Sequence, residues 1–362
     1  MSKPASYRDF DWFLFLLAIS VAAIGVVEIY STTAHTVLAT EYKKQIYWVL
    51  LGCLVALVLS RFDYHTLLEA TPWLYVLSAV GLGAVLVLSH ATKGARRWLH
   101  FGGFTFQVSE LAKLVIIMAV AVYFADKRDK VVTWKDLARL GVLIGIPMAL
   151  VAAEPDLGTA LTFLPVLAAG IFVGGIRARQ VGILCLVGAL VLPVGWRVLK
   201  PYQRERIETF VHPARDTQGH GYQASQAKIA IGSGGFWGKG LGNGMQSRLG
   251  FIPVSHADFI FASFAEEEGF VGALIVFVLY FLLLLRLLDG AQIAGDRAGA
   301  FLLVGFASLL FFQVAVNIGM MIGFLPITGI PLPLMSEGGS ATLLTFAGLG
   351  LVMSVKMRRF VN

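Results

Sequence analysis

The stretch "SHADFIFASFAEEEGF", residues 255–270, leads directly into the apolar run "VGALIVFVLYFLLLL", residues 271–285. Its acidic residues are Asp258, Glu266, Glu267 and Glu268. Carboxylates are costly beside hydrocarbon, and in membrane proteins they usually mark functional positions. The stretch therefore predicts a membrane helix with a polar entrance, and it raises the question of what the four acids do.

The composition extends this pattern to the whole chain. Of 362 residues, 57% are hydrophobic and only 14% are charged, whereas a soluble domain has about 45–50% apolar and about 25% charged residues. The apolar residues form blocks of membrane-spanning length, so we predict an all-α polytopic membrane protein, a single domain over residues 1–362 with about ten transmembrane helices. The expected spans are 10–31, 45–60, 74–89, 108–126, 138–153, 159–174, 181–198, 260–287, 300–322 and 339–357.

The distribution of basic residues predicts the orientation. With the N-terminus in the cytoplasm, Lys and Arg concentrate in the short cytoplasmic segments, and an even number of spans leaves both termini inside. The formal charge of +7 then reflects this asymmetry and contact with membrane lipids. Because no regular array of basic and aromatic residues is present, we expect no nucleic-acid partner. Cys53 and Cys185 lie inside apolar runs, and we interpret them as small hydrophobic residues.

A long loop separates the seventh and eighth expected spans, from Trp196 to Ala257. Its segment "YQASQAKIAIGSGGFWGKG", residues 222–240, predicts an amphipathic helix followed by a glycine-rich turn, ordered against the outer membrane surface. Arg204 and Arg206 lie two residues apart, as they would along a strand-like edge, and Lys239 lies among glycines that permit close approach. These three are candidates for binding an anionic group, although general attraction to lipid headgroups explains them almost equally well.

Two further polar stretches lie nearer the N-terminus. In "QVSELAKL", Glu110 and Lys113 are three residues apart and share a helix face, which predicts either a self-neutralising pair or a polar cavity. Arg96 and Arg97 precede them, at a position where basic side chains often only reach toward the interface. In "EPDLGTAL", the spacing of Asp156 favours a helix N-cap.

Around the opening stretch, an uninterrupted helix starting at Asp258 would place Ala262, Ala265 and Gly269 on one face. Small residues at this spacing permit close helix contact, so Asp258 would lie at the mouth of a tight seam. The alternative is that Asp258 only caps the helix. His256 lies two residues away, but no clear set of metal ligands accompanies this pair.

The segment before the last expected span is broken by Pro326, Pro331 and Pro333. Broken backbone at membrane depth occurs only where it is buried in protein or lines a water-filled cavity. Ser336 adds a hydroxyl there, and Gln313 and Asn317 give the preceding span a polar face, for which contact between helices is the simple explanation. The glycine run around Lys239 lacks the spacing of a nucleotide-binding loop.

Together these stretches resemble the SEDS family (shape, elongation, division and sporulation proteins). The matching segments are "GARRWL", "QVSELAKL", "EPDLGTAL", "QASQAKIAIGSGG", "GKGLGNG", "HADFIFASFAEEEGFVG" and "LPITGIPLPLMSEGGS", in family order from Gly94 to Ser340. The short N-terminal tail is more similar to the elongation branch of the family than to its division branch.

The resemblance implies a ten-helix peptidoglycan glycosyltransferase of the bacterial cell membrane that polymerises lipid II during cell-wall elongation. It implies a class B penicillin-binding protein as partner and Asp258 as the residue essential for polymerisation. The family's polar cavity corresponds to Glu110, Lys113, Asp156 and Ser336, and its basic loop to Arg96 and Arg97. The chain departs from the family pattern at Val108, Ala257 and Glu337, where Pro, Thr and Tyr are usual.

The implied reaction assigns roles to these residues. Asp258 would act as general base on the sugar hydroxyl, and Arg204, Arg206, Lys239 and the other outer basic residues would stabilise the departing diphosphate. A divalent cation is another way to stabilise it, but the sequence identifies no cofactor. Two alternatives remain open: a transporter that flips lipid II, and a non-catalytic scaffold for a penicillin-binding protein.

Overall fold

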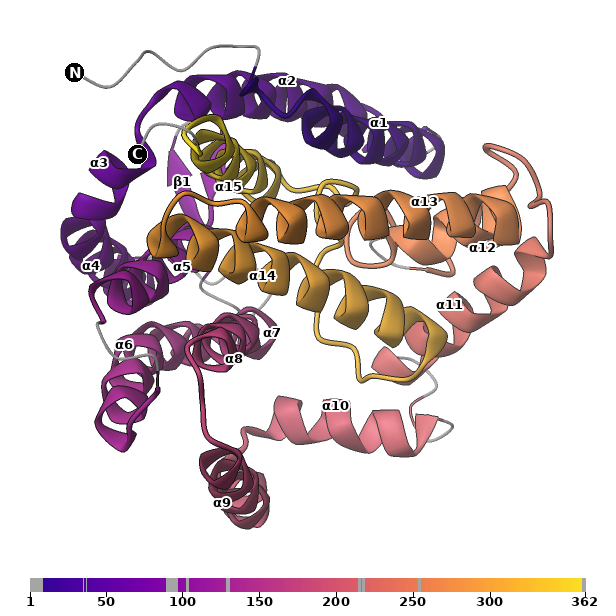
Figure 1. The fold of residues 1–362 in the computed structure, drawn as a ribbon. Coiled ribbons are helices and arrows are strands. Elements are labelled where there is room, and N and C mark those ends of the chain that lie inside the picture. The colour runs from indigo at the N-terminus through magenta and orange to yellow at the C-terminus, as the bar shows by residue number, and fades with distance from the viewer. Residues whose placement is uncertain are drawn as a thin grey trace.

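The computed structural model describes residues 9–34, 36, 38–88, 97–101, 104–127, 131–213, 216, 219–252 and 255–359. Within these ranges the chain is almost entirely helical (Figure 1). The described strands are the short antiparallel pair β1 (Leu99–Phe101) and β2 (Phe104–Phe106), in which Leu99 lies opposite Phe106. The all-α class predicted from the sequence is therefore confirmed.

Seven described helices are long and apolar enough to cross a membrane. They are α1 (Trp12–Thr33), α2 (Glu41–Arg61), α5 (Val108–Asp126), α6 (Trp134–Ala153), α13 (Ile260–Gln292), α14 (Arg297–Ile322) and α15 (Gly339–Met357). Further apolar helices occupy the other three expected positions: α4 (Thr71–Leu88), α8 (Phe163–Val173) preceded by α7 (Leu157–Leu161), and α9 (Ala178–Val198). A polytopic membrane protein follows, while the count of ten spans stays a prediction.

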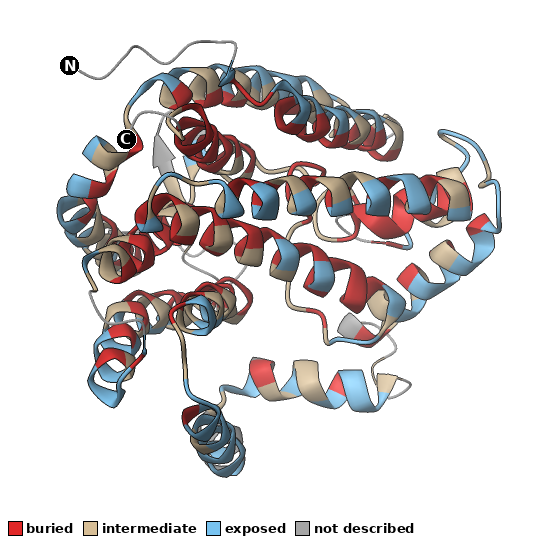
Figure 2. Cartoon of the chain, in the orientation of Figure 1, coloured by how far each residue is buried: buried red, intermediate tan, exposed pale blue. Residues whose placement is uncertain are grey.

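The long loop after α9 is ordered into helices, as expected. It contains α10 (Pro201–Val211), α11 (His220–Gly234) and α12 (Met245–Arg248), and a short α3 (Tyr64–Glu69) joins α2 to α4. Helices α13 and α14 run side by side through the middle of the molecule, whereas α9 stands away from the bundle (Figure 1). Buried residues gather on α5, α14 and α15, and α9 is mostly exposed (Figure 2), as suits a helix in lipid.

The first and last long helices meet at one end of the bundle. Asp11 caps α1 by accepting from the backbone N–H of Leu14 at 3.1 Å. Its carboxylate also binds Lys356 Nζ at 2.5 Å near the end of α15, and Arg286 Nε at 2.9 Å in the second half of α13. The start of α13, and with it Asp258, therefore lies toward the opposite end of the bundle.

Helix α13 is broken at Gly269, which has φ 66° and ψ −161°. A glycine loop, residues 235–244, replaces the hydrogen bonds that the break removes. The N–H groups of Phe270 and Val271 donate to the carbonyls of Gly235 and Phe236 at 3.0 and 3.2 Å. The carbonyls of Glu266 and Glu267 accept from the N–H groups of Lys239 and Gly240 at 3.1 and 2.8 Å.

This break corrects one expectation drawn from the sequence. The helix begins at Ile260, not at Asp258, and Gly269 is not part of a continuous small-residue face. A Cβ atom at Gly269 would collide with the backbone N of Gly238, and a Cβ at Gly238 would collide with the carbonyl oxygen of Glu267. Glycine is therefore required on both sides of the contact, for close approach as well as for its positive φ.

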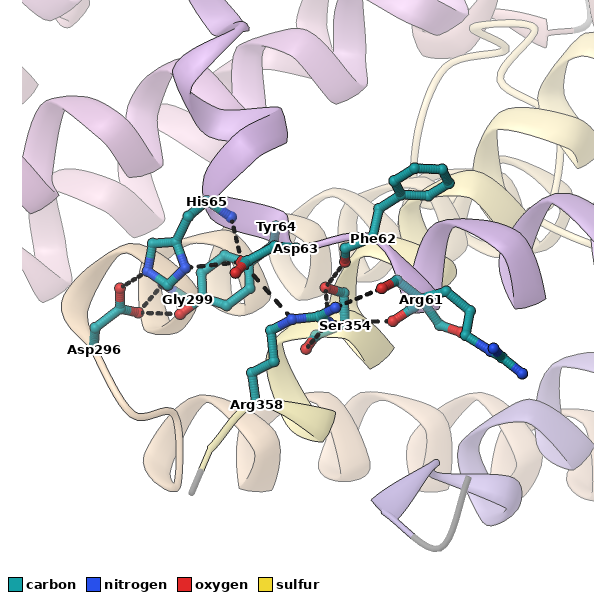
Figure 3. Close-up of polar contacts among 10 residues, drawn as sticks. Arg61, Phe62, Asp63, Tyr64, His65, Asp296, Gly299, Ser354 and Arg358 are labelled. Carbon is teal, nitrogen blue, oxygen red and sulfur yellow. Dashed lines mark hydrogen bonds and ion pairs between the residues drawn. The ribbon is translucent and has the colours of Figure 1, made fainter. Parts of the chain in front are cut away.

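A polar junction ties α3 to the start of α14 (Figure 3). The ring of His65 lies between two carboxylates, with Nδ1 3.0 Å from Asp63 Oδ1 and Nε2 2.8 Å from Asp296 Oδ2. Asp296 also caps α14 and accepts from the Tyr64 hydroxyl at 2.8 Å. Because both ring nitrogens face carboxylates, the doubly protonated imidazolium fits the junction best.

We expect the contribution of His65 to the stability of the protein to fall as pH rises above 6.5. Partial burial opposes the charge of the ring, but hydrogen bonds to Asp296 and Asp63 outweigh it and raise the pKa of His65 above 6.5. A raised folded-state pKa contributes stability that is complete below pH 6.5 and is lost as pH rises through the folded value. The melting temperature in detergent should fall over that range, and the fall should disappear in His65→Gln. An unchanged pH dependence in His65→Gln would contradict this assignment.

Candidate functional site

The backbone around Asp258 is held from three directions. The carbonyl of His256 accepts from the N–H of Glu337 at 3.1 Å, and that of Ala257 accepts from Ser336 Oγ at 2.7 Å. The carbonyl of Asp258 accepts from Asn317 Nδ2 at 3.0 Å. The residue that caps α13 is Phe259, with no side-chain hydrogen bond, so the alternative that Asp258 serves as a helix cap is wrong.

The proline loop, residues 323–338, forms the floor of this site. Asn317 Nδ2 also donates to the carbonyl of Ile330 at 2.8 Å, and Ser336 Oγ accepts from the N–H of Leu332 at 2.8 Å. Asn317 therefore anchors the loop and is not merely a contact between helices. Ile330, Leu332 and Leu334 are buried, which confirms that the broken backbone is enclosed in protein.

Asp258 lies directly over this floor at Gly329. A Cβ atom built at Gly329, which has φ 74°, would lie 3.5 Å from Asp258 Oδ2. On one side, Arg206 Nη1 donates to the carbonyl of Thr328 at 3.2 Å. On the other side, Gly158 packs so closely on the same carbonyl that a Cβ there would collide with it. Helices α7 and α10 and the residue Asp258 thus converge on Thr328 and Gly329.

Asp156 brings a second cation to this region. It caps α7, accepting from the N–H of Thr159 at 3.2 Å and from its hydroxyl at 2.9 Å, so the predicted cap is confirmed. Its Oδ2 also accepts from Gln107 Nε2 at 3.2 Å and lies 3.8 Å from Arg97 Nε. Arg97 donates in addition to the carbonyl of Pro155. Arg96, the other predicted basic residue, lies outside the described residues.

Sequence reasoning missed Glu154, which lies beside Asp156 and is 1% exposed. Burial and the charge of Asp156 raise the pKa of Glu154 to about 8, against the opposing effect of Arg97. Its carboxyl is therefore neutral at pH 7 and can donate a hydrogen bond. The sequence signal for Glu154 was its position in "EPDLGTAL", but that segment was interpreted through Asp156 as a helix cap.

Glu110 and Lys113 form the expected pair, with 2.7 Å between Oε1 and Nζ. Their side chains are 7% and 5% exposed, and with Gln313 and Thr345 they line a cavity of about 20 Å³ between α5, α14 and α15. Such a volume holds about one water molecule. The pair therefore forms a small polar centre within the bundle, and its lining does not include Asp258.

The expected edge of Arg204 and Arg206 is wrong, because both lie on helix α10. Residues two apart on a helix project to nearly opposite sides. Arg206 reaches Thr328 in the site, whereas Arg204 Nη2 donates back to the carbonyl of Arg197 at 2.7 Å. The two arginines therefore have different surroundings, which a sequence spacing of two did not reveal.

Two of the acids in the opening stretch hold the glycine loop. Glu266 is fully buried and binds Lys239 Nζ at 2.6 Å and the N–H of Gln246 at 3.1 Å. Glu267 accepts from the hydroxyl of Ser31 at 2.7 Å and from the N–H of Gly242 at 3.0 Å. Lys239 also donates to the hydroxyl of Ser233, at 2.7 Å. Its ammonium thus neutralises an acid beneath the loop, and the structure does not bring it to Asp258.

The departures from the family pattern are accommodated locally. Glu337 Oε2 lies 3.1 Å from His256 Nε2, and burial together with Glu41 raises the pKa of Glu337 to about 7. Ala257 contributes its backbone carbonyl to Ser336, a contact that any residue can make. Val108 is the first residue of α5, where proline is tolerated but not needed. Among the described residues, no group of three or more His, Cys, Asp or Glu is placed to hold a metal ion.

The fold and the site define a class of protein: a polytopic membrane protein in which the carboxylate of Asp258 lies over Gly329, next to the carbonyl of Thr328 that Arg206 binds, at one end of the bundle. The family model for cell cycle proteins of the FtsW, RodA and SpoVE type matches residues 11–360, and the chain belongs to this family. The SEDS resemblance is thereby confirmed.

Individual relatives agree along nearly the whole chain. Peptidoglycan glycosyltransferase MrdB of Escherichia coli (strain K12) is 38% identical over 350 residues, covering 96% of this chain and 93% of the relative. Peptidoglycan glycosyltransferase RodA of Treponema pallidum (strain Nichols) is 31% identical over 428 residues, covering 97% and 98%. This chain is likewise a peptidoglycan glycosyltransferase.

Solved structures share the fold. The rod shape determining protein RodA of Thermus thermophilus is similar with a TM-score of 0.74 and 32% identity, covering 98% of this chain and 99% of that chain. A chain from a study of how a peptidoglycan synthase complex coordinates polymerization and crosslinking is similar with a TM-score of 0.84 and 34% identity, with the same coverage.

We expect Glu154 to limit glycosyltransferase activity at high pH. As pH rises through about 8, Glu154 ionises beside Asp156 and adds a second negative charge to the site. Activity should then fall, whereas Glu154→Gln, whose amide resembles the neutral acid, should keep its activity at pH 7 and lose this alkaline fall. A rate measured from pH 6 to pH 9.5 for both proteins tests this. Identical alkaline limbs would show that another group is responsible.

Proposed function

We propose that the chain polymerises lipid II, with Asp258 as the general base. The observation that carries this proposal is the position of the Asp258 carboxylate over Gly329, with Arg206 held on the adjacent Thr328. A carboxylate and a guanidinium are thereby fixed to neighbouring residues of one loop. This is the pair of groups that transfer of a sugar from a diphosphate requires.

The reaction joins the sugar hydroxyl of one lipid II molecule to the anomeric carbon of another. Asp258 accepts the hydroxyl proton as the oxygen attacks, the new glycosidic C–O bond forms, and the C–O bond to the diphosphate breaks. The diphosphate leaves without protonation, so a second carboxylic acid is not needed and the anomeric centre is inverted. In this respect the site differs from glycoside hydrolases, which use two carboxyl groups.

Arg206 and Arg97 are the cations best placed to bind the diphosphate. Arg206 approaches from α10 through Thr328, and Arg97 approaches through Asp156 and the carbonyl of Pro155 at the start of α7. A planar guanidinium binds two phosphate oxygens at once, which favours arginine over lysine here. Asp156, Ser336 and Glu110 with Lys113 then hold helices and loops in place, and their direct contact with substrate is not required.

The partner and the orientation belong to the same proposal. We assign a class B penicillin-binding protein as partner, and the likeness to a chain of a synthase complex that couples polymerization to crosslinking supports it. The ion pairs of Asp11 with Lys356 and Arg286 support an even number of passes, with both termini in the cytoplasm and Asp258 facing outward. Cell-wall elongation is the process we assign.

Purified protein with labelled lipid II separates this proposal from its rivals. Glycan chains establish polymerisation. Movement of intact lipid II across vesicle membranes without chains would favour the transporter. A protein that forms no chains and moves no lipid II, but still binds a penicillin-binding protein, would favour the scaffold. Polymerisation measured with and without that partner tests the assembly separately.

Asp258→Asn should reduce polymerisation about 100-fold or more, because a positioned base contributes about 10²–10⁴ in rate. The variant should fold and insert normally, since asparagine matches the shape of aspartate and the backbone carbonyls of residues 257 and 258 keep their bonds to Ser336 and Asn317. Asp289→Asn, an exposed change of the same kind on α13, is the matched control and should keep full activity. Near-normal glycan synthesis by Asp258→Asn would remove the general-base assignment.

Arg206→Lys should weaken lipid II turnover about tenfold, because a lysine keeps the charge but cannot bind two phosphate oxygens at once. Arg204→Lys is a control two residues away on the same helix, and it should be close to the parent because Arg204 bonds to Arg197. Membrane insertion and partner binding should be unchanged in both. Equal activity of the two variants would mean that charge alone, and not diphosphate geometry, is what α10 supplies.

A further inference from the structure

Two acids near the broken helix, the buried Glu28 and the half-buried Glu268, have no role in the site described above. Glu28 lies on α1 and Glu268 lies on α13, directly before the break at Gly269. These helices are neighbours, joined by the bond from Ser31 to Glu267 (Figure 1). The groove between them holds a cavity of about 360 Å³, lined by both glutamates and by Ile24, Leu241, Phe264 and Ile275.

Glu28 is 1% exposed, and both of its carboxyl oxygens lack a hydrogen-bond partner among the described residues. Its neighbours are satisfied: Glu266 by Lys239, and Glu267 by Ser31 and Gly242. An unpaired carboxyl in such a place is costly unless a donor reaches it. Glu28 therefore provides an acceptor that the described part of the protein leaves unused.

The cavity opens toward the lipid. Ile275 and Val27, which both line it, are 51% and 47% exposed on the outside of the bundle. Glu28 lies five residues before the end of α1, about 8 Å along the helix axis, so the groove is close to the membrane surface on the side of Asp258. Leu241, from the glycine loop, contributes to its lining at this end.

The walls and the charges restrict what fits. Apolar side chains favour a hydrocarbon segment, and two carboxyl groups favour a hydrogen-bonding cation. The residues that line the cavity include no Lys, Arg or His, so this groove offers no cation to the diphosphate of a polyprenyl substrate. A quaternary ammonium has the charge but no N–H group to donate.

We propose that this groove is a binding site for a membrane lipid with a primary-amine headgroup, whose ammonium donates to Glu28 and Glu268. The acyl chain lies along Ile24 and Ile275, and the headgroup lies beneath Leu241. The bound lipid joins α1 to α13 beside the glycine loop and reinforces the contact between Ser31 and Glu267. This inference does not depend on the assignment of Asp258.

The test uses the full-length protein in nanodiscs that contain equal amounts of dioleoyl phosphatidylethanolamine, phosphatidylcholine and phosphatidylglycerol. Lipid retained after gentle release is counted by native mass spectrometry. We expect about tenfold enrichment of phosphatidylethanolamine over the other two lipids, as charge-assisted hydrogen bonds predict. The enrichment should be lost in Glu28→Gln and kept in Glu69→Gln, an exposed glutamate on α3.

A second variant keeps the test decisive if Glu28→Gln folds poorly. Ala23→Trp fills the groove from its exposed wall without changing any charge, and it should abolish the enrichment while leaving the melting temperature unchanged. Equal retention of the three lipids by the parent protein, or enrichment that survives both variants, would overturn the proposal.

A hydrophobic carbodiimide gives an independent readout, because it modifies carboxyl groups that are reachable from lipid. Phosphatidylethanolamine should protect Glu28 from labelling, and phosphatidylglycerol should not. Protection that appears only when a penicillin-binding protein is added would instead identify a protein helix as the occupant, and the lipid assignment would be wrong.

Discussion

The insertion of the glycine loop into the break in α13 is the interaction on which the rest of the structure depends. Backbone groups of Glu266, Glu267, Phe270 and Val271, which a continuous helix would satisfy internally, bond to the loop instead. An unsatisfied backbone group in hydrocarbon costs several kcal/mol, so the loop cannot leave without a large penalty. The carboxylates of Glu266 and Glu267 fasten the same loop through Lys239, Ser31 and Gly242.

The position of Asp258 is linked to that constraint, because only Phe259 separates Asp258 from the start of α13, the helix whose residues 266–271 the loop fastens. The described contacts to its segment reach main-chain carbonyls, from Ser336, Asn317 and Glu337. Because Asp258 is held by its backbone, its carboxylate is kept in position over Gly329. The groups around the carboxylate then determine its reactivity. Such preorganisation is what a general base needs, since the reacting hydroxyl must lie within hydrogen-bond reach.

Charges inside the bundle divide according to whether they are paired. Asp11 with Lys356, Glu110 with Lys113 and Glu266 with Lys239 are close pairs, of which the first and third join distant parts of the chain and the second lies within α5. Breaking a buried pair is costly because it leaves one charge uncompensated. Glu154 and Glu28 each have a buried carboxyl oxygen with no hydrogen-bond partner in the described part of the chain, and they are where the structure suggests chemistry or binding in place of scaffolding.

The sequence alone determined what depends on neighbours along the chain: apolar runs long enough to span a membrane, the i,i+3 pairing of Glu110 with Lys113, the cap at Asp156, and a broken segment at the prolines. Motif order also identified the family. Only the tertiary structure showed that Gly269 breaks its helix, that Lys239 neutralises Glu266, and that Arg204 and Arg206 lie on a helix with different surroundings. Those features depend on partners far away in sequence, such as Ser31 for Glu267 and Thr328 for Arg206. Spacing along one segment carries no information about which distant backbone will complete its hydrogen bonds or share its charge.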